Sequence, residues 1–315
     1  MPLFEIGMVV AGLLALYVGA ETLVRGASSS ALRLGITPLV IGLTVVSFGT
    51  SAPELLVCLL ATDDLSVGNI IGSNVANLAL VLGAAAMVHP IEVKARAVRR
   101  DMPVMVGATV LFILLAIDGT LSRVDGAVLL GAMALYLAYT FIQARQDMAR
   151  FEELWGDEME RLEERHRPWW ADAGLVVVGI AGLGLGAKWM VDGSIVIAGH
   201  FGISELVIGI TVVALGTSLP ELATSLVAAY RDEADISVGN VIGSNIFNLL
   251  LVLGVVASVG SLTLSADALS IDLWVVLAIS IGVWPLLRSG HTLDRREGAL
   301  LLVVYVGYVV TLFLR

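Results

Sequence analysis

Long apolar stretches follow one another along the whole chain, with short polar connections between them. An α-helix needs roughly 17–25 mainly apolar residues to cross the hydrocarbon of a membrane. The stretches lack the alternation of apolar and polar positions that marks the strands of a membrane barrel. Stretches that reach or approach the length of a span cover residues 4–26, 37–61, 66–88, 102–117, 122–143, 171–191, 205–229, 237–259, 270–287 and 297–314. The pattern therefore predicts an all-α polytopic membrane protein with ten transmembrane helices.

The longest polar segment, at about residues 144–168, follows the fifth apolar stretch. Its Glu and Asp residues are interleaved with Arg, which is typical of a solvated helical connection. We therefore divide the chain into a first five-helix unit over residues 1–143, a charged cytoplasmic linker over 144–170 and a second five-helix unit over 171–315.

Composition agrees with a membrane protein. Of 315 residues, 58% are hydrophobic and 15% are charged, whereas soluble domains carry roughly a quarter charged residues. The first apolar stretch continues too far, and lacks the basic start, for a signal peptide. The one cysteine, Cys58, excludes a disulfide within the chain, and we interpret it as a small buried residue. The histidines lie at span ends or in connections, which argues against a histidine proton relay; they are His89, His166, His200 and His291.

The basic residues predict how the chain is oriented. Ten spans place both termini on the same side, and cytoplasmic connections of membrane proteins are enriched in Lys and Arg. If the termini are outside, 15 of the 18 Lys and Arg residues lie at inner ends, and only Arg123, Lys188 and Arg315 lie outside. We therefore expect a multi-pass protein of the cell (inner) membrane with both termini outside.

The two halves of the chain are copies of each other. Residues 35–54 match residues 202–221 at 14 of 20 positions, and residues 66–83 match residues 237–254 at 14 of 18 positions. Because each half has an odd number of spans, the second half must insert upside down relative to the first. Inverted repeats with helices interrupted at corresponding places are the sequence signature of a secondary transporter.

The strongest identity is a polar string inside an apolar stretch, GTSAPE at residues 49–54 and GTSLPE at residues 216–221. Proline cannot donate a backbone hydrogen bond and clashes with the preceding turn. We therefore expect the second and seventh helices to break just before Pro53 and Pro220, which frees backbone carbonyls around residues 47–50 and 214–217.

Glu54 and Glu221 close these strings and add one carboxylate in each half. Carbonyls, hydroxyls and carboxylates form an all-oxygen ligand set of the kind that hard cations such as calcium select. Two carboxylates balance one divalent ion or two monovalent ions, which is what exchange through a shared site requires. The alternative for the small residues of the repeats is close helix packing alone, but packing does not call for two glutamates.

The second shared string, SVGNxIGSNxxN, begins at residues 66 and 237 and brings further oxygen atoms. Ser73 and Asn77 lie one helical turn apart on the same face, as do Ser244 and Asn248. The other asparagines of the string fit two roles equally well, as ligands or as residues that cap or bridge helices; they are Asn69, Asn74, Asn240 and Asn245.

The strings G-T-S-x-P-E and S-V-G-N-x-I-G-S-N-x-x-N resemble the two α-repeats of the sodium/calcium exchanger family, within the cation/calcium antiporters. The resemblance covers both halves and implies alternating access at one ion cluster between the second, third, seventh and eighth helices. Calcium would then bind Glu54, Glu221 and the carbonyls of Thr50 and Thr217. The implied sodium ligands are Ser47, Thr50, Ser51, Glu54, Ser73, Asn77, Ala214, Thr217, Ser218, Glu221, Ser244 and Asn248.

The chain departs from the family pattern at Asn248, where many relatives carry Asp, so the stoichiometry and any potassium dependence stay open. The resemblance implies an electrogenic sodium/calcium antiporter that needs no cofactor, binds no nucleic acid and acts as a monomer in the bilayer. Proton/calcium or other divalent cation exchange is the alternative, with Glu54 and Glu221 titrating. An intramembrane hydrolase lacks a nucleophile and base at mid-membrane, and a channel would gather such oxygens around an oligomeric axis.

Overall fold

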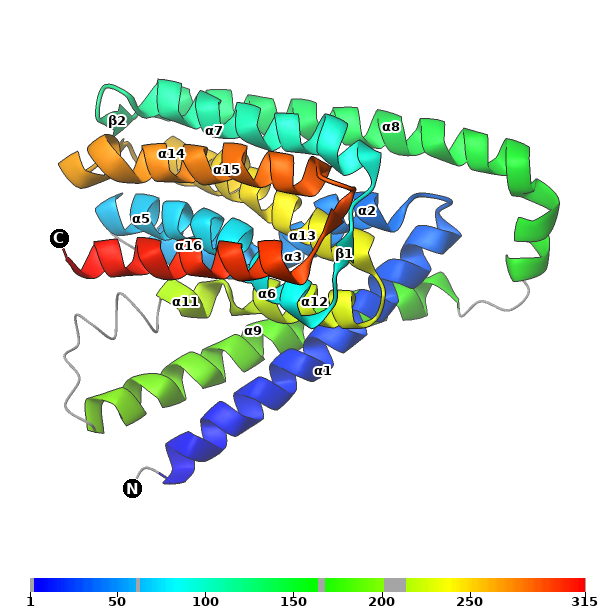
Figure 1. The fold of residues 1–315 in the computed structure, drawn as a ribbon, viewed down its shortest axis with the longest axis horizontal. Helices are drawn as coiled ribbons and strands as arrows, with labels where there is room; N and C mark the ends of the chain where they lie inside the picture. The colour runs from blue at the N-terminus through cyan, green and yellow to red at the C-terminus, as the bar shows by residue number, and fades with distance from the viewer. Residues whose placement is uncertain (1–2, 61–62, 164–167, 201–213, 315) are drawn as a thin grey trace.

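The structure is a computed structural model, and it describes residues 3–60, 63–163, 168–200 and 214–314. Within these residues the chain is almost entirely helical, and most helices lie side by side in one bundle (Figure 1). Seven helices of the described part are long and apolar enough to cross a membrane; they cover Leu3–Arg33, Pro38–Leu60, Ser66–Val88, Arg123–Gln146, Trp169–Ile197, Ala234–Val259 and Ala268–Arg288. The prediction of a multi-pass helical membrane protein is thereby confirmed.

The elements fall in two series, in which η denotes a segment of π-helix. The first series is α1 Leu3–Arg33, α2 Pro38–Ile41, η1 Gly42–Val46, α3 Ser47–Thr50, α4 Ala52–Leu60, α5 Asp63–Val75, η2 Ala76–Val81, α6 Leu82–Val88, β1 Ile91–Glu92, η3 Ala97–Asp101, α7 Met102–Ala116, β2 Thr120–Leu121 and α8 Arg123–Glu163. The second is α9 Trp169–His200, α11 Ala214–Thr217, α12 Leu219–Tyr230, α13 Ala234–Phe247, η5 Asn248–Val252, α14 Leu253–Val259, β3 Leu262–Thr263, η6 Ala268–Asp272, α15 Leu273–Arg288, β4 Thr292–Leu293 and α16 Arg295–Phe313.

Three of the ten predicted spans are not among the seven. Residues 102–117 form α7, whose 15 residues are short for a span. Residues 297–314 fall in α16, which begins with Arg295, Arg296 and Glu297. Residues 205–213 of the seventh span lie outside the described part of the chain. The backbone of α8 continues from Arg123 to Glu163, so most of the charged linker prolongs the fifth span as helix.

The same order of elements recurs in both halves from α5 and α13 onward. In each half an α-helix passes into a π-helical segment at the second shared string, which is η2 in the first half and η5 in the second. Short antiparallel strand pairs then join the halves, because β1 pairs with β4 and β2 pairs with β3. A π-helical turn inside an α-helix is frequent at functional sites, and both of these turns begin beside asparagines of the shared string.

Helices α1 and α9 form a separate layer against the rest of the bundle (Figure 1). Glycines recur on both helices at seven-residue spacing, namely Gly12, Gly19 and Gly26 on α1 and Gly179, Gly186 and Gly193 on α9. A Cβ atom at Gly19 would lie 2.7 Å from the backbone nitrogen of Leu183. The small residues therefore let the two backbones approach closely, as in other membrane helix pairs.

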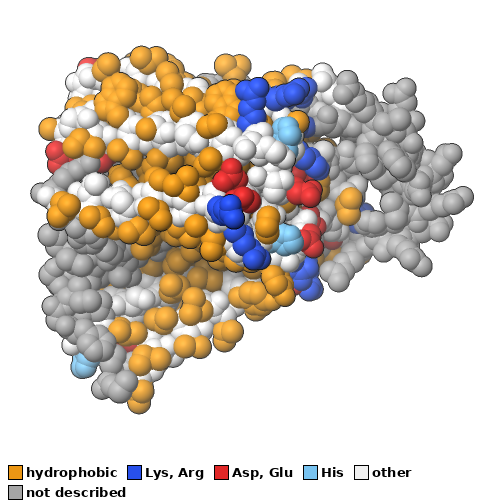
Figure 2. All heavy atoms as spheres, viewed as in Figure 1, with side chains coloured by type: hydrophobic (Ala, Val, Ile, Leu, Met, Phe, Trp, Pro, Cys, Tyr) orange, Lys and Arg blue, Asp and Glu red, His pale blue; other side chains and the backbone are white. Residues whose placement is uncertain are grey.

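The charged residues gather at one end of the apolar body (Figure 2). Large apolar side chains such as Leu14, Leu56 and Leu114 are exposed on the body itself. At the charged end Arg231 pairs with Glu21, and Arg33 Nε lies 3.3 Å from Asp172 Oδ2. This division is what a protein needs when lipid surrounds its body and water meets its end.

Candidate functional site

Both proline motifs interrupt a helix in the same way. In the first half α3 ends at Thr50, Ser51 adopts a turn conformation (φ −81°, ψ 2°), and α4 begins at Ala52. In the second half α11 ends at Thr217, Ser218 has φ −86° and ψ 3°, and α12 begins at Leu219. The helix therefore breaks at the serine of each motif, two residues before the proline, as predicted.

The break frees fewer carbonyls than the sequence suggested. The Ser51 N–H still donates to the Ser47 carbonyl at 3.0 Å, and the Ser218 N–H donates to the Leu215 carbonyl at 3.1 Å. Since proline has no N–H, the groups that lose a helical donor are the carbonyls four residues before Pro53 and Pro220.

The two glutamates of the motifs are fully buried. Glu54 and Glu221 each have 0% of their surface exposed, and their carboxylates are close enough to repel each other. Within the described residues, both carboxylate oxygens of Glu54 and Oε2 of Glu221 lack a hydrogen-bond donor, while Glu221 Oε1 accepts from Ser51 Oγ at 3.4 Å. Buried carboxylates without donors are costly unless a cation pairs with them.

Hydroxyl groups from both halves surround each carboxylate. Ser73 and Thr217 lie near Glu54, and Thr50, Ser51 and Ser244 lie near Glu221, to which Ser51 donates. Hydroxyls from opposite halves also meet directly, because Ser218 Oγ donates to Ser73 Oγ at 3.2 Å and Thr50 Oγ1 lies 3.3 Å from Ser244 Oγ. We call the two glutamates and these hydroxyl residues the oxygen cluster.

The asparagines Asn77 and Asn248 are fully buried at the start of the π-helical segments. In the described structure neither amide atom of Asn77 has a hydrogen-bond partner. Asn248 Nδ2 donates to Asn74 Oδ1 at 3.1 Å, and its own Oδ1 lacks a donor among the described residues. Two carbonyl oxygens of this kind suit a hard cation.

Two predicted sodium ligands are placed differently from the rest. The Ser47 hydroxyl donates to the Gly42 carbonyl at 2.6 Å, and the Ser47 carbonyl already accepts from the Ser51 N–H. Ala214 is the first residue of α11, and the chain before it lies outside the described part. Hydrogen bonds therefore join Thr50 to Ser244, Ser51 to Glu221 and Ser218 to Ser73 across the two halves, and the Ser47 carbonyl borders them because it also accepts from Thr50 Oγ1 at 3.4 Å.

Two buried hydroxyls escaped the sequence analysis. Thr224 and Ser237 have 0% exposure, and neither hydroxyl has a hydrogen-bond partner within the described residues. Thr224 lies three residues after Glu221 on α12, and Ser237 opens the second shared string. Helical spacing from Glu221 is the signal by which the sequence could have identified Thr224.

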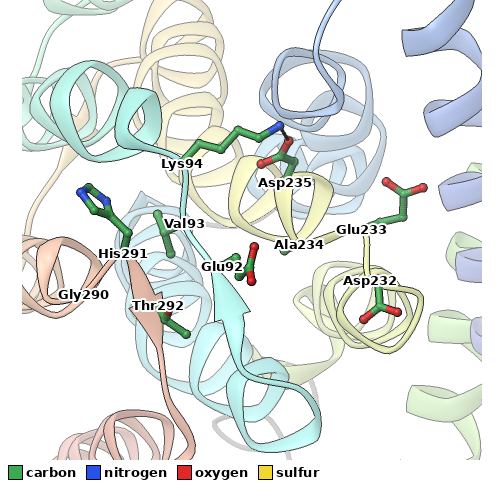
Figure 3. A pocket seen from close by; sticks show the side chains of 10 residues that line it. All are labelled: Glu92, Val93, Lys94, Asp232, Glu233, Ala234, Asp235, Gly290, His291 and Thr292. Atoms are coloured by element: carbon green, nitrogen blue, oxygen red, sulfur yellow. Dashed lines mark hydrogen bonds and ion pairs between the residues drawn. The ribbon is translucent and has the colours of Figure 1, made fainter.

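A cavity of about 480 Å³ lies at the charged end of the bundle and shares no residue with the oxygen cluster. It is lined by Glu92, Val93, Lys94, Asp232, Glu233, Ala234, Asp235, Gly290, His291 and Thr292. Figure 3 shows Lys94 reaching Asp235, with which it forms an ion pair. The acidic residues of this cavity are therefore partly compensated by a basic side chain.

The sodium/calcium exchanger protein family model matches residues 4–142 and 172–314 of the chain. The putative antiporter CaxA of Alkalimonas amylolytica is 38% identical over 312 residues, which cover 97% of each chain. Inner membrane protein YrbG of Escherichia coli is 39% identical over 323 residues, covering 99% of this chain and 97% of the relative. The structure of the sodium-calcium exchanger NCX_Mj superposes with a TM-score of 0.85 at 32% identity, covering 99% of this chain and all of that one.

Proposed function

The chain belongs to the sodium/calcium exchanger family, and from this premise we propose that it is an antiporter that drives calcium out of the cell with sodium. The observation that carries the proposal is the pair of fully buried glutamates, Glu54 and Glu221, of whose four carboxylate oxygens three have no hydrogen-bond donor among the described residues. A calcium ion balances their two charges, and sodium ions can take its place.

The ligands divide by atom type. Glu54 and Glu221 bind both ions, and the carbonyls of Thr50 and Thr217 add to the calcium site. Their hydroxyls, together with Ser51, Ser218, Ser73 and Ser244, hold sodium. Asn77 and Asn248 occupy the centre, and the carbonyls of Ser47 and Ala214 complete the outer sodium sites.

The proposed mechanism is alternating access between two inverted repeats of five helices, which makes ten spans with both termini outside the inner membrane. The broken second and seventh helices carry the ligands together with the third and eighth helices, and a monomer contains the complete site. Three sodium ions against two carboxylates leave one positive charge, whereas one calcium ion leaves none. Exchange at that ratio moves net charge and responds to voltage, at about 2.3 kcal/mol per charge per 100 mV.

Uptake of calcium-45 into proteoliposomes tests the coupling ion. Vesicles loaded with sodium and diluted into sodium-free buffer should accumulate calcium, while choline-loaded vesicles should not. Valinomycin with potassium then tests for net charge movement. Uptake that ignores sodium but follows a pH gradient would replace this proposal with proton/calcium exchange, in which the same buried carboxyls carry the protons.

Replacing Thr50 or Thr217 by Ala should weaken the binding of sodium more than the binding of calcium, because the backbone carbonyl remains and only the hydroxyl is lost. A lost polar contact to a charged group corresponds to about a tenfold change or more. We expect the sodium concentration for half-maximal exchange to rise by about that factor, with the calcium value nearly unchanged. Thr109→Ala is the matched control, since Thr109 is as buried as Thr50 and its hydroxyl donates to the Met105 carbonyl of its own helix. An equal loss for both ions would contradict the division of roles.

A further inference from the structure

A duplicated hydrogen-bond chain ties the two threonines of the oxygen cluster to side chains outside it. Thr50 Oγ1 donates to Asn240 Oδ1 at 3.1 Å, and Asn240 Nδ2 donates to Ser225 Oγ at 3.0 Å. In the other half, Thr217 Oγ1 donates to Asn69 Oδ1 at 3.4 Å, and Asn69 Nδ2 donates to Cys58 Sγ at 3.6 Å.

The two chains occupy equivalent positions of the repeat. The shift of 167 that aligns the proline motifs relates Thr50 to Thr217 and Cys58 to Ser225, and the shift of 171 that aligns the second strings relates Asn69 to Asn240. Each hydrogen-bond chain starts at a threonine of one half of the protein and ends at a residue of the other half. The arrangement is therefore part of the duplicated architecture and links the broken helix of one repeat to the opposite repeat.

The chemistry of a hydroxyl explains what the asparagine does. A hydroxyl has one proton and two lone pairs, and it can ligate a cation through its oxygen only if the proton points away. The amide oxygen of each asparagine takes that proton. Thr50 Oγ1 has its shortest hydrogen bond with Asn240 Oδ1 at 3.1 Å and lies 3.3 Å from Ser244 Oγ, so its proton is directed to the asparagine and its lone pairs remain available to the oxygen cluster.

The last residue of each hydrogen-bond chain, Ser225 in one and Cys58 in the other, keeps the asparagine amide from rotating. We call these two the outer residues. Asn240 Nδ2 donates both to Ser225 Oγ and to the Glu221 carbonyl at 3.3 Å, and a carbonyl can only accept, which fixes the orientation of the amide. In the first half, Cys58 Sγ donates to the Ser66 carbonyl at 3.5 Å. That bond uses the thiol proton and leaves the sulfur as the acceptor for Asn69.

We propose that Asn69 and Asn240 are positioning residues that orient the two threonine hydroxyls for sodium, and that Cys58 and Ser225 set how firmly they do so; this inference rests on the proposed function. Sulfur is a weaker acceptor than a hydroxyl oxygen, and the chain through Cys58 is the longer one at both steps. The orientation of the Thr217 hydroxyl is therefore less restricted than that of the Thr50 hydroxyl.

Substitutions of the outer residues test this without touching the ligands. The sodium-loaded proteoliposome assay gives the half-maximal sodium and calcium concentrations for the wild type, Ser225→Ala, Ser225→Cys and Cys58→Ser. Loss of one hydrogen bond corresponds to about a 3–10-fold change. We expect Ser225→Ala to raise the half-maximal sodium concentration by that factor and to leave the half-maximal calcium concentration unchanged. Ser225→Cys should raise the sodium concentration less than Ser225→Ala does. Cys58→Ser should lower the half-maximal sodium concentration below that of the wild type. Asn240→Ala should shift the sodium value further in the same direction, if it folds.

Ser280→Ala is the control, because Ser280 is as buried as Ser225 and bonds the Val276 carbonyl within α15. A merely structural role of Ser225 would reduce the amount of folded protein and leave both half-maximal concentrations alone. Equal shifts for sodium and calcium, or no shift in the folded Ser225 and Cys58 variants, would overturn the inference. Wild-type vesicles without sodium-dependent uptake would overturn the proposed function itself, and the two failures are thus distinguishable.

Discussion

Glu54→Gln and Glu221→Gln should each abolish sodium-dependent calcium uptake. Glutamine keeps the shape of the side chain and removes one of the two negative charges that face the ion. Removing one partner of a buried charge pair costs about 3–5 kcal/mol, which corresponds to a loss of roughly 100-fold or more in affinity. The initial rate of calcium-45 uptake into sodium-loaded proteoliposomes measures this loss at matched protein content.

Neither substitution should prevent folding, because each replaces a carboxylate that is buried and short of donors by a neutral group. Gel filtration of the purified variants checks that point. Glu5→Gln is the control, since Glu5 lies in the first turn of α1 and does not belong to the oxygen cluster, and it should leave uptake unchanged. Full activity in both Glu54→Gln and Glu221→Gln would contradict the assignment of the ion site to these two glutamates.

Gly243→Ala should have the second large effect, through packing. An added Cβ would lie 2.2 Å from Ser47 Oγ, 2.8 Å from the Leu43 carbonyl oxygen and 2.9 Å from Leu43 Cα. Two of these atoms belong to the backbone, so α13 must move away from η1 and α3. Overpacking of this kind typically costs about 1–3 kcal/mol. Because the move also separates Thr50 from Asn240 and Ser244, we expect transport to fall together with stability.

Thermal unfolding of the purified protein measures the loss of stability, and the same preparation serves for the uptake assay. Gly131→Ala is the control: Gly131 is exposed on α8, and no described atom lies within 4 Å of an added Cβ. The control should keep its melting temperature and its activity. A Gly243→Ala protein as stable and as active as the wild type would show that the close approach of α13 to η1 is not needed.

Much of the candidate site can be predicted from the sequence because the same two motifs occur in both halves. The proline strings predict the helix breaks at Ser51 and Ser218, and the paired glutamates predict a shared cation site. The structure confirms the helix breaks and the burial of Cys58, at 1% exposure, whereas the cation site stays a prediction. These features depend on local backbone chemistry and on the free-energy cost of placing charge in a membrane, and one sequence is enough to recognise both.

Other features depend on contacts between the repeats, which no local pattern contains. The sequence left Asn69 and Asn240 open between ligand and bridge, and only the packing of one half against the other shows their bonds to Thr217 and Thr50. The hydrogen bond of the Ser47 hydroxyl to the Asn240 carbonyl of the opposite half, at 3.2 Å, is likewise visible only in the packed structure. The π-helical segments η2 and η5 escaped prediction because the spans around them are apolar on almost every side, so the shift of register that a π-helical turn introduces leaves no mark in the apolar pattern.

Competition between sodium and calcium for the purified protein tests the central claim most directly. Equilibrium binding of calcium-45 is measured while sodium is raised at constant ionic strength with choline, in the wild type and in the Glu54→Gln, Glu221→Gln double variant. One shared cluster predicts that sodium displaces calcium completely, with a cooperative dependence on sodium, and that the double variant binds no calcium. Calcium binding that sodium leaves unchanged, or that survives in the double variant, would contradict the account.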